Sequence, residues 1–189
     1  MPTPYAYFKG EIVPLEDAKI GVMTHAFNYG TAVFEGVRGN WNPDAQQAFL
    51  FRLREHFVRL EQSAKILRMA PRESVDRLCE IAVELVERSG FTEDVYLRPM
   101  VYLSGEVLGV RLHNVEQDTL IFLSPFPAYL PETARCHTST WRRVNDTGIP
   151  PRAKVTGIYV NSALAKTEAN LNGFDEAIML NEDGHVSEG

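Results

Sequence analysis

Long apolar runs are missing from this sequence of 189 residues. No stretch approaches the ~18 to 20 consecutive apolar residues that a helix needs to cross a bilayer. The first residues, Met1 to Tyr5, lack the basic and apolar regions of a secretory signal peptide. We therefore predict a cytoplasmic protein that makes no membrane contact.

Cysteine is scarce as well. Cys79 and Cys136 are the only two, and they have neither the spacing of metal ligands nor the density of a disulfide framework. We expect both thiols to be reduced and structural, and we predict no metal site.

Positive charge is in the minority. Lys and Arg number 19 against 25 Asp and Glu, which gives a net charge of −6, and no basic stripe interrupts this balance. Nucleic acid and anionic membranes are therefore poor candidates for the main partner. The hydrophobic content of 44% is enough for one generous core or two small ones. Small molecules are the expected partners.

Two helices are predicted in the first part of the chain. Apolar residues recur at helical spacing over 54–68, and a longer pattern begins near Pro71 and ends at Gly90. The apolar positions are Phe57, Leu60, Ala64 and Leu67 in the first helix, and Val75, Leu78, Ile81, Ala82, Leu85 and Val86 in the second.

Strands are predicted on both sides of these helices. The first two, at 5–8 and 11–13, flank Lys9-Gly10 as a hairpin, and the others lie at 48–51, 95–103 and 119–123. Pro99 lacks the N–H that a sheet needs, so the strand that contains it is expected at an edge or a bulge. The order of elements predicts an α+β domain over residues 1–124.

A proline-rich segment, 125–134, is predicted to link this domain to a second one. The second domain, 135–189, would contain a strand at 137–143, a helix at 159–172 that ends at Gly173, a strand at 176–180 and a turn at 181–184. This is little material for an independent core, and the sequence stops just after a hairpin turn. We expect this domain to be incomplete.

Lys154, Tyr159 and Glu188 follow one another in an order that suits pyridoxal phosphate. A lysine amine forms a Schiff base with an aldehyde, a phenol bonds the ring oxygen, and a carboxylate keeps the pyridine nitrogen protonated. The spacing alone leaves open that Lys154 is a solvated surface lysine, that Tyr159 packs in the core and that Glu188 is a polar residue after a turn.

Five segments together resemble the branched-chain amino acid aminotransferases, which are fold-type IV enzymes dependent on pyridoxal phosphate and similar to D-amino acid aminotransferase. The segments are HAFNYGTAVFEGVR at 25–38, REHFVRL at 54–60, YLRP at 96–99, KVTGIY with the following Asn161-Ser162 at 154–162, and SEG at 187–189. The resemblance implies a small α/β domain beside a larger pseudo-barrel domain. It also implies a homodimer, or a higher homo-oligomer, whose sites borrow residues from the neighbouring subunit.

The resemblance assigns roles to residues of the cofactor site. Lys154 would carry the cofactor and move protons, Tyr159 would contact the ring oxygen, and Glu188 would face the ring nitrogen. Arg59 would hold the phosphate, a task that suits a permanently charged fork of donors. The alternative for Arg59 is a surface ion pair with Glu55 or Glu61. His56 would support Arg59.

Substrate-facing residues are implied in the same way. They are Tyr29, Phe34, Gly36, Tyr96, Arg98 and Tyr129, and the loop at 108–110 is expected to reach in from a second subunit. Aromatic walls suit branched aliphatic side chains, whereas Arg98 and the tyrosine hydroxyls suit the distal carboxylate of glutamate. For Phe34 and Tyr129 the alternative is ordinary core packing.

The function implied is transfer of an amino group between L-leucine, L-isoleucine or L-valine and 2-oxoglutarate. D-Amino acid transaminases, amine transaminases of R selectivity and aminodeoxychorismate lyases resemble the chain around Lys154, and the atypical stretch 39–44 leaves room for such a specificity. A non-catalytic binding protein with the same fold is the alternative from another class.

Overall fold

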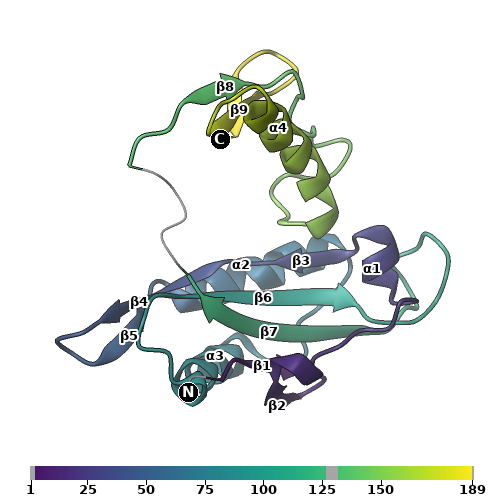
Figure 1. Ribbon diagram of the computed structural model, residues 1–189. Coiled ribbons are helices and arrows are strands. Elements are labelled where there is room, and N and C mark those ends of the chain that lie inside the picture. Colours follow the sequence, from purple (N-terminus) through teal and green to yellow (C-terminus); the bar gives the residue numbers. More distant parts are fainter. Residues whose placement is uncertain (1–2, 127–131, 189) are drawn as a thin grey trace. The chain divides into compact units, whose positions relative to one another are not determined.

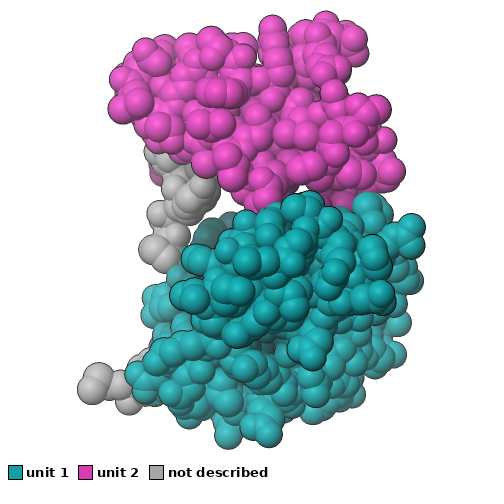
Figure 2. All heavy atoms as spheres, turned by 90° about the vertical axis from the view of Figure 1, so that its right-hand side faces the viewer, with its two compact units in different colours: residues 1–127 teal, residues 128–189 magenta. Residues whose placement is uncertain are grey.

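The computed structural model describes residues 3–126 and 132–188. The chain divides into two compact units, residues 1–127 and 128–189, which are coloured separately in Figure 2. Of the segment expected as a linker, residues 127–131 lie outside the described residues, and Pro125 belongs to a strand.

The first unit is built on an antiparallel sheet of seven strands (Figure 1). The spatial order is β2-β1-β7-β6-β4-β5, and β3 also pairs with β6. The strands are β1 (Tyr5–Phe8), β2 (Glu11–Pro14), β3 (Ala32–Phe34), β4 (Val37–Asn42), β5 (Gln47–Leu50), β6 (Val95–Leu103) and β7 (Gln117–Pro125). The predicted hairpin at 5–8 and 11–13 is confirmed as β1 and β2, whereas β3 and β4 were not predicted.

Two helices, α2 (Leu53–Ile66) and α3 (Val75–Ser89), lie side by side against this sheet. A short α1 (His25–Tyr29) contacts β6, and a 3-10 turn, η1 (Leu15–Asp17), follows β2. The apolar positions predicted for α2 are all buried, and those of α3 are buried or half-buried. The helical period in the sequence therefore identified the faces that form the core.

The prediction that α3 begins at Pro71 is wrong, because the helix starts at Val75. The backbone N–H of Arg72 donates to Thr119 Oγ1 at 2.8 Å, so the residues around Pro71 are tied to β7 before the helix begins. Ser74 then caps the helix by accepting a hydrogen bond from the Arg77 N–H at 3.3 Å. Gly90 ends the helix in the left-handed conformation, as predicted.

Replacing Ser74 by alanine should lower the free energy of unfolding by about 1 kcal/mol, because the first turn of α3 loses its cap. Chemical denaturation of the two proteins measures this difference. Ser74→Gly is the matched control and should cost only a few tenths of that amount, since glycine is itself tolerated at this position. Equal stability of wild type and Ser74→Ala would show that the cap is immaterial.

Pro99 is neither at an edge nor at a bulge. It lies in β6, which is an interior strand and pairs with β7 in one unbroken register. On its other side β6 pairs first with β4 and then with β3, and Pro99 falls at the break between them, opposite Glu35. The Glu35 N–H donates to the Pro99 carbonyl at 2.9 Å. A missing N–H is tolerated there because no regular strand pairing is interrupted.

The second unit has a sheet of three strands in the order β10-β9-β8. They are β8 (Cys136–Thr138), β9 (Glu176–Leu180) and β10 (Val186–Glu188), and η2 (Thr156–Ile158) leads into the helix α4 (Tyr159–Leu171). The predicted helix and the strand at 176–180 are confirmed. The strand predicted at 137–143 is shorter, because Ser139 and Thr140 turn to hydrogen-bond the Glu168 carboxylate on α4.

A core cluster of the second unit lies between α4 and β9. It consists of Ala165 and Ala169 on α4 and Ala177 and Met179 on β9, and Phe174 packs against it. Small residues let the helix lie close to the strand, but they bury little apolar area.

Neither cysteine is paired. Cys79 is half-buried in α3, where burial raises the pKa of its thiol. Cys136 is exposed on β8. Within the parts of the chain that the structure describes, no helix is both long and apolar enough to cross a membrane.

Candidate active site

Lys154 lies on the segment that enters α4. Its neighbours Ala153 and Val155 are buried, as is Ile158 one turn on, and these apolar contacts anchor the segment while the lysine stays half-buried. Lys154 Nζ donates to the hydroxyl oxygen of Tyr159 at 2.6 Å. The predicted pair of lysine and phenol is therefore in direct contact within the second unit.

Glu188 lies on β10 at the end of the described chain. Arg143, whose side chain is 11% exposed, approaches the Glu188 carboxylate at 3.1 Å and also donates to Ser162 Oγ at 3.2 Å. Tyr159 and Glu188 both border a cavity of about 430 Å³ inside the second unit. One oxygen of the carboxylate is thus anchored by Arg143, which was not predicted as a site residue.

Asn161 and Ser162 explain how Arg143 is held. The Asn161 side chain accepts from the Val144 N–H at 3.2 Å and donates to the Arg142 carbonyl at 3.0 Å. Both bonds join the start of α4 to the segment that carries Arg143. The Asn-Ser pair that follows Tyr159 therefore has a structural task, which is to fix the arginine beside Glu188.

Four residues expected to face the substrate lie together in the first unit. The Arg98 guanidinium lies 4.3 Å from the centre of the Phe34 ring and donates to the Tyr96 hydroxyl at 3.0 and 3.2 Å. Gly36 is pressed against the same tyrosine, since a Cβ there would lie 2.2 Å from its hydroxyl oxygen. The structure thus brings Phe34, Gly36, Tyr96 and Arg98 into one group.

Strand register accounts for this group. Phe34 is opposite Met100, and Val37 is opposite Leu97, so Gly36 and Arg98 face each other across the two strands. Alternation then turns Phe34 and Gly36 to one side and Glu35 to the other. Tyr96 also stacks on Phe126, with 5.3 Å between the ring centres, and this contact holds the Tyr96 ring in place.

Tyr29 holds a loop. Its hydroxyl accepts a hydrogen bond from the Gly109 N–H at 3.1 Å. The buried His25 binds the Gly109 carbonyl through Nε2 at 2.9 Å, and its Nδ1 lies 2.8 Å from Thr31 Oγ1. Because a carbonyl only accepts, Nε2 carries the hydrogen. The loop at 108–110 is therefore held through both the N–H and the carbonyl of Gly109.

Arg59 projects from α2 and binds Glu35, not Glu55 or Glu61. Its Nε and Nη2 donate to the two Glu35 carboxylate oxygens at 2.5 and 2.7 Å, and His56 Nδ1 donates at 2.9 Å. Glu55 pairs instead with Arg52, and Glu61 with Lys65. Burial raises the pKa of Glu35, but the hydrogen bonds and charges of Arg59 and His56 outweigh burial and hold the pKa below its ordinary value.

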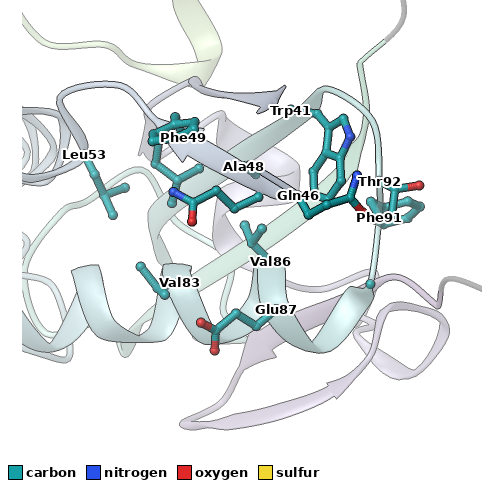
Figure 3. A pocket seen from close by; sticks show the side chains of 13 residues that line it. Trp41, Gln46, Ala48, Phe49, Leu53, Val83, Val86, Glu87, Phe91 and Thr92 are labelled. Atoms are coloured by element: carbon teal, nitrogen blue, oxygen red, sulfur yellow. The ribbon is translucent and has the colours of Figure 1, made fainter. Parts of the chain in front are cut away.

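Tyr129 and a cavity of the first unit do not contribute to the site as the structure describes it. Tyr129 lies outside the described residues. A cavity of about 690 Å³ in the first unit lies between the β4–β5 hairpin and α3, and none of the predicted site residues lines it. Figure 3 shows Trp41 and Phe91 at one end of it and Phe49 and Leu53 at the other.

Comparison with known proteins agrees with this geometry. The family model described as amino-transferase class IV matches residues 32–189. A probable branched-chain-amino-acid aminotransferase of Aquifex aeolicus is 46% identical over 98% of this chain and 60% of the relative. The branched-chain-amino-acid aminotransferase of Salmonella typhimurium is 38% identical over 98% of this chain and 61% of its own.

Solved structures give the same result. The branched-chain aminotransferase of Thermoproteus uzoniensis with norvaline superimposes with a TM-score of 0.91 at 39% identity, over 99% of this chain and 63% of that one. The branched-chain amino acid aminotransferase of Thermobaculum terrenum in its PLP form also gives 0.91, at 35% identity, over 100% of this chain and 62% of that one. The predicted α+β, fold-type IV architecture is confirmed, and the chain spans about 60% of the length of these relatives. This chain belongs to the amino-transferase class IV family.

Proposed function

We propose that the protein is a cytoplasmic transaminase that uses pyridoxal phosphate to exchange amino groups between L-branched-chain amino acids and 2-oxoglutarate. The observation that carries the proposal is the 2.6 Å hydrogen bond between Lys154 Nζ and the Tyr159 hydroxyl. It stands in a chain that is 46% identical to a probable aminotransferase named for branched-chain amino acids.

The donors of the second unit fit pyridoxal phosphate. An amine, a phenol and an anchored carboxylate are the groups that its aldehyde, ring oxygen and ring nitrogen require. When bound, the cofactor supplies an aldehyde that condenses with amino groups and a ring that withdraws electrons from the substrate. Lys154, Tyr159 and Glu188 would hold it in the second unit, and the guanidinium of Arg59 is a group that suits its phosphate.

Each residue then has a defined task. The Lys154 amine carries a proton to and from the substrate Cα, and the Tyr159 hydroxyl fixes the amine's position. The carboxylate of Glu188, held by Arg143, favours the protonated ring nitrogen. In the first unit Phe34 and Tyr96 offer apolar walls to leucine, and Arg98 offers its charge to the distal carboxylate of glutamate.

Homo-oligomers are part of the proposal. The loop clamped by Tyr29 and His25 presents Leu108 and Val110 to solvent, and nearby α1 presents Phe27. Exposed apolar side chains of this size gathered around one loop are typical of surfaces that meet another chain. Light scattering on the intact protein should give a dimer or a larger assembly, and a monomer at micromolar concentration would contradict this part.

A substrate panel tests the specificity. The full-length protein is incubated with 2-oxoglutarate and, separately, with L-leucine, D-alanine and (R)-1-phenylethylamine, and glutamate formation is followed. Turnover of L-leucine well above the other two is expected. Turnover of D-alanine or of the amine alone would assign the protein to the related transaminases, and turnover of none would leave the non-catalytic alternative.

A further inference from the structure

Glu35 is the most completely buried acidic side chain of the candidate site. It lies between β3 and β4, its side chain is 0% exposed, and it accepts three hydrogen bonds from Arg59 and His56. Its own backbone N–H is bonded to Pro99. Both ends of the residue are therefore fixed, one in the sheet and the other on α2.

The carboxylate is ionised, because Arg59 and His56 more than offset the effect of burial and keep its pKa below the ordinary value. A buried ion pair is weak evidence for stability, since well-packed apolar residues often serve a fold equally well. A role in orienting a functional group is a better reason to bury this charge.

Arg59 is the group that is oriented. Its side chain is 56% exposed, so neighbouring atoms cover less than half of its surface. The bonds from Nε and Nη2 to the two oxygens of Glu35 hold one edge of the planar fork. The plane of the guanidinium is thereby fixed, and its opposite edge is directed away from Glu35.

We propose that Glu35 is a positioning residue that presents Arg59 to the phosphate of the cofactor, an inference that rests on the function proposed above. Because Glu35 lies between Phe34 and Gly36, it also links the position of Arg59 to that of the substrate-facing residues. The strand segment that presents the substrate-facing group on one side holds the phosphate-binding arginine from the other. A shift of this segment moves both.

Two effects of opposite sign follow from removing the carboxylate. The loss of a negative charge near Arg59 would tighten the binding of a phosphate, because the arginine loses its counter-charge. The loss of orientation would weaken it, because the arginine must be ordered when the phosphate arrives. The positioning role predicts that the second effect is larger, so the sign of the change is diagnostic.

The test compares pyridoxal phosphate with pyridoxal, which lacks the phosphate. Affinities of both are measured by absorbance titration of the full-length apoprotein for wild type, Glu35→Gln, Arg59→Ala and the double variant. Glu35→Gln should lose about tenfold in affinity for pyridoxal phosphate and little for pyridoxal. In the Arg59→Ala background the same change should have no further effect.

Glu61→Gln is the matched control, because Glu61 lies on α2 and is ion-paired with Lys65, away from Glu35. It should leave both affinities unchanged. If Glu35→Gln does not fold, Glu35→Asp carries the same test, since it keeps the charge but withdraws the carboxylate by one methylene. The same selective loss is expected.

The outcomes separate this inference from the function on which it rests. A wild-type protein that shows no preference for pyridoxal phosphate over pyridoxal would overturn the proposed function itself. A wild-type preference that Glu35→Gln leaves equal or increases would overturn the positioning role alone. A loss in Glu35→Gln that is equally large for pyridoxal, or that persists in Arg59→Ala, would show a general structural role and would also overturn it.

Discussion

Replacing Lys154 by alanine should lower the rate of amino-group transfer by about 10⁴-fold. The variant loses the amine that carries protons to and from the substrate, a contribution of ~10² to 10⁴-fold by itself, and it also loses the covalent attachment point of the cofactor. Steady-state transfer from L-leucine to 2-oxoglutarate, with saturating pyridoxal phosphate, measures the effect.

Lys65→Ala is the control for this variant. Lys65 lies on α2 in an exposed ion pair with Glu61, so its loss should leave the rate unchanged. A Lys154→Ala protein that keeps a tenth or more of the wild-type rate would mean that another group performs the proton transfer.

Replacing Gly36 by alanine should lower kcat/KM for L-leucine by about 10²-fold. The added methyl group would lie 2.2 Å from the Tyr96 hydroxyl oxygen and 2.8 Å from Cζ, so the tyrosine must move. Its hydrogen bonds with Arg98 and its stacking on Phe126 would then be disturbed. A displacement of ~1 Å in a binding group is enough for such a loss.

Two variants check the cause of this loss. Gly148→Ala is the matched control, because a Cβ there meets its nearest neighbours at 3.4 Å and needs no rearrangement. Adding Tyr96→Phe to Gly36→Ala removes the atom in closest contact and should return part of the activity, provided that Tyr96→Phe alone is active. A Gly36→Ala enzyme with wild-type kcat/KM would show that this side of the sheet does not face the substrate.

The fold was predictable where one period repeats over several turns. Phe57, Leu60 and Ala64 mark the buried face of α2, and Leu78, Ile81 and Leu85 mark that of α3. The short β3 was missed because Ala32, Val33 and Phe34 are all apolar and buried, so no alternation of apolar and polar residues reveals a strand.

The position of Pro99 illustrates another limit. Its missing N–H was interpreted as a sign of an edge strand, a rule that holds when neighbouring strands are continuous. Here two short strands, β3 and β4, share one side of β6, and the proline falls between them. The order of strands in a sheet depends on contacts between distant segments, which the local sequence does not contain.

The candidate site was predictable in part. The contact between Lys154 and Tyr159 joins residues five positions apart, at the start of a helix that the sequence also predicted. Glu35 was missed as a partner of Arg59 because 24 residues separate them. The sequence does contain one indication of this role, because Glu35 follows the apolar residues 32–34 and precedes Gly36-Val37. An acidic side chain that is buried among apolar residues needs hydrogen-bond or ion-pair partners.

The most direct test of the account is an absorbance spectrum of the full-length protein with pyridoxal phosphate, recorded before and after L-leucine and then 2-oxoglutarate. Borohydride reduction of the resting protein and peptide mapping follow. We expect a cofactor band that leucine bleaches and the keto acid restores, and a reduced cofactor attached to the peptide that contains Lys154. A folded protein that binds no cofactor, or that retains it on a different lysine, would contradict the account.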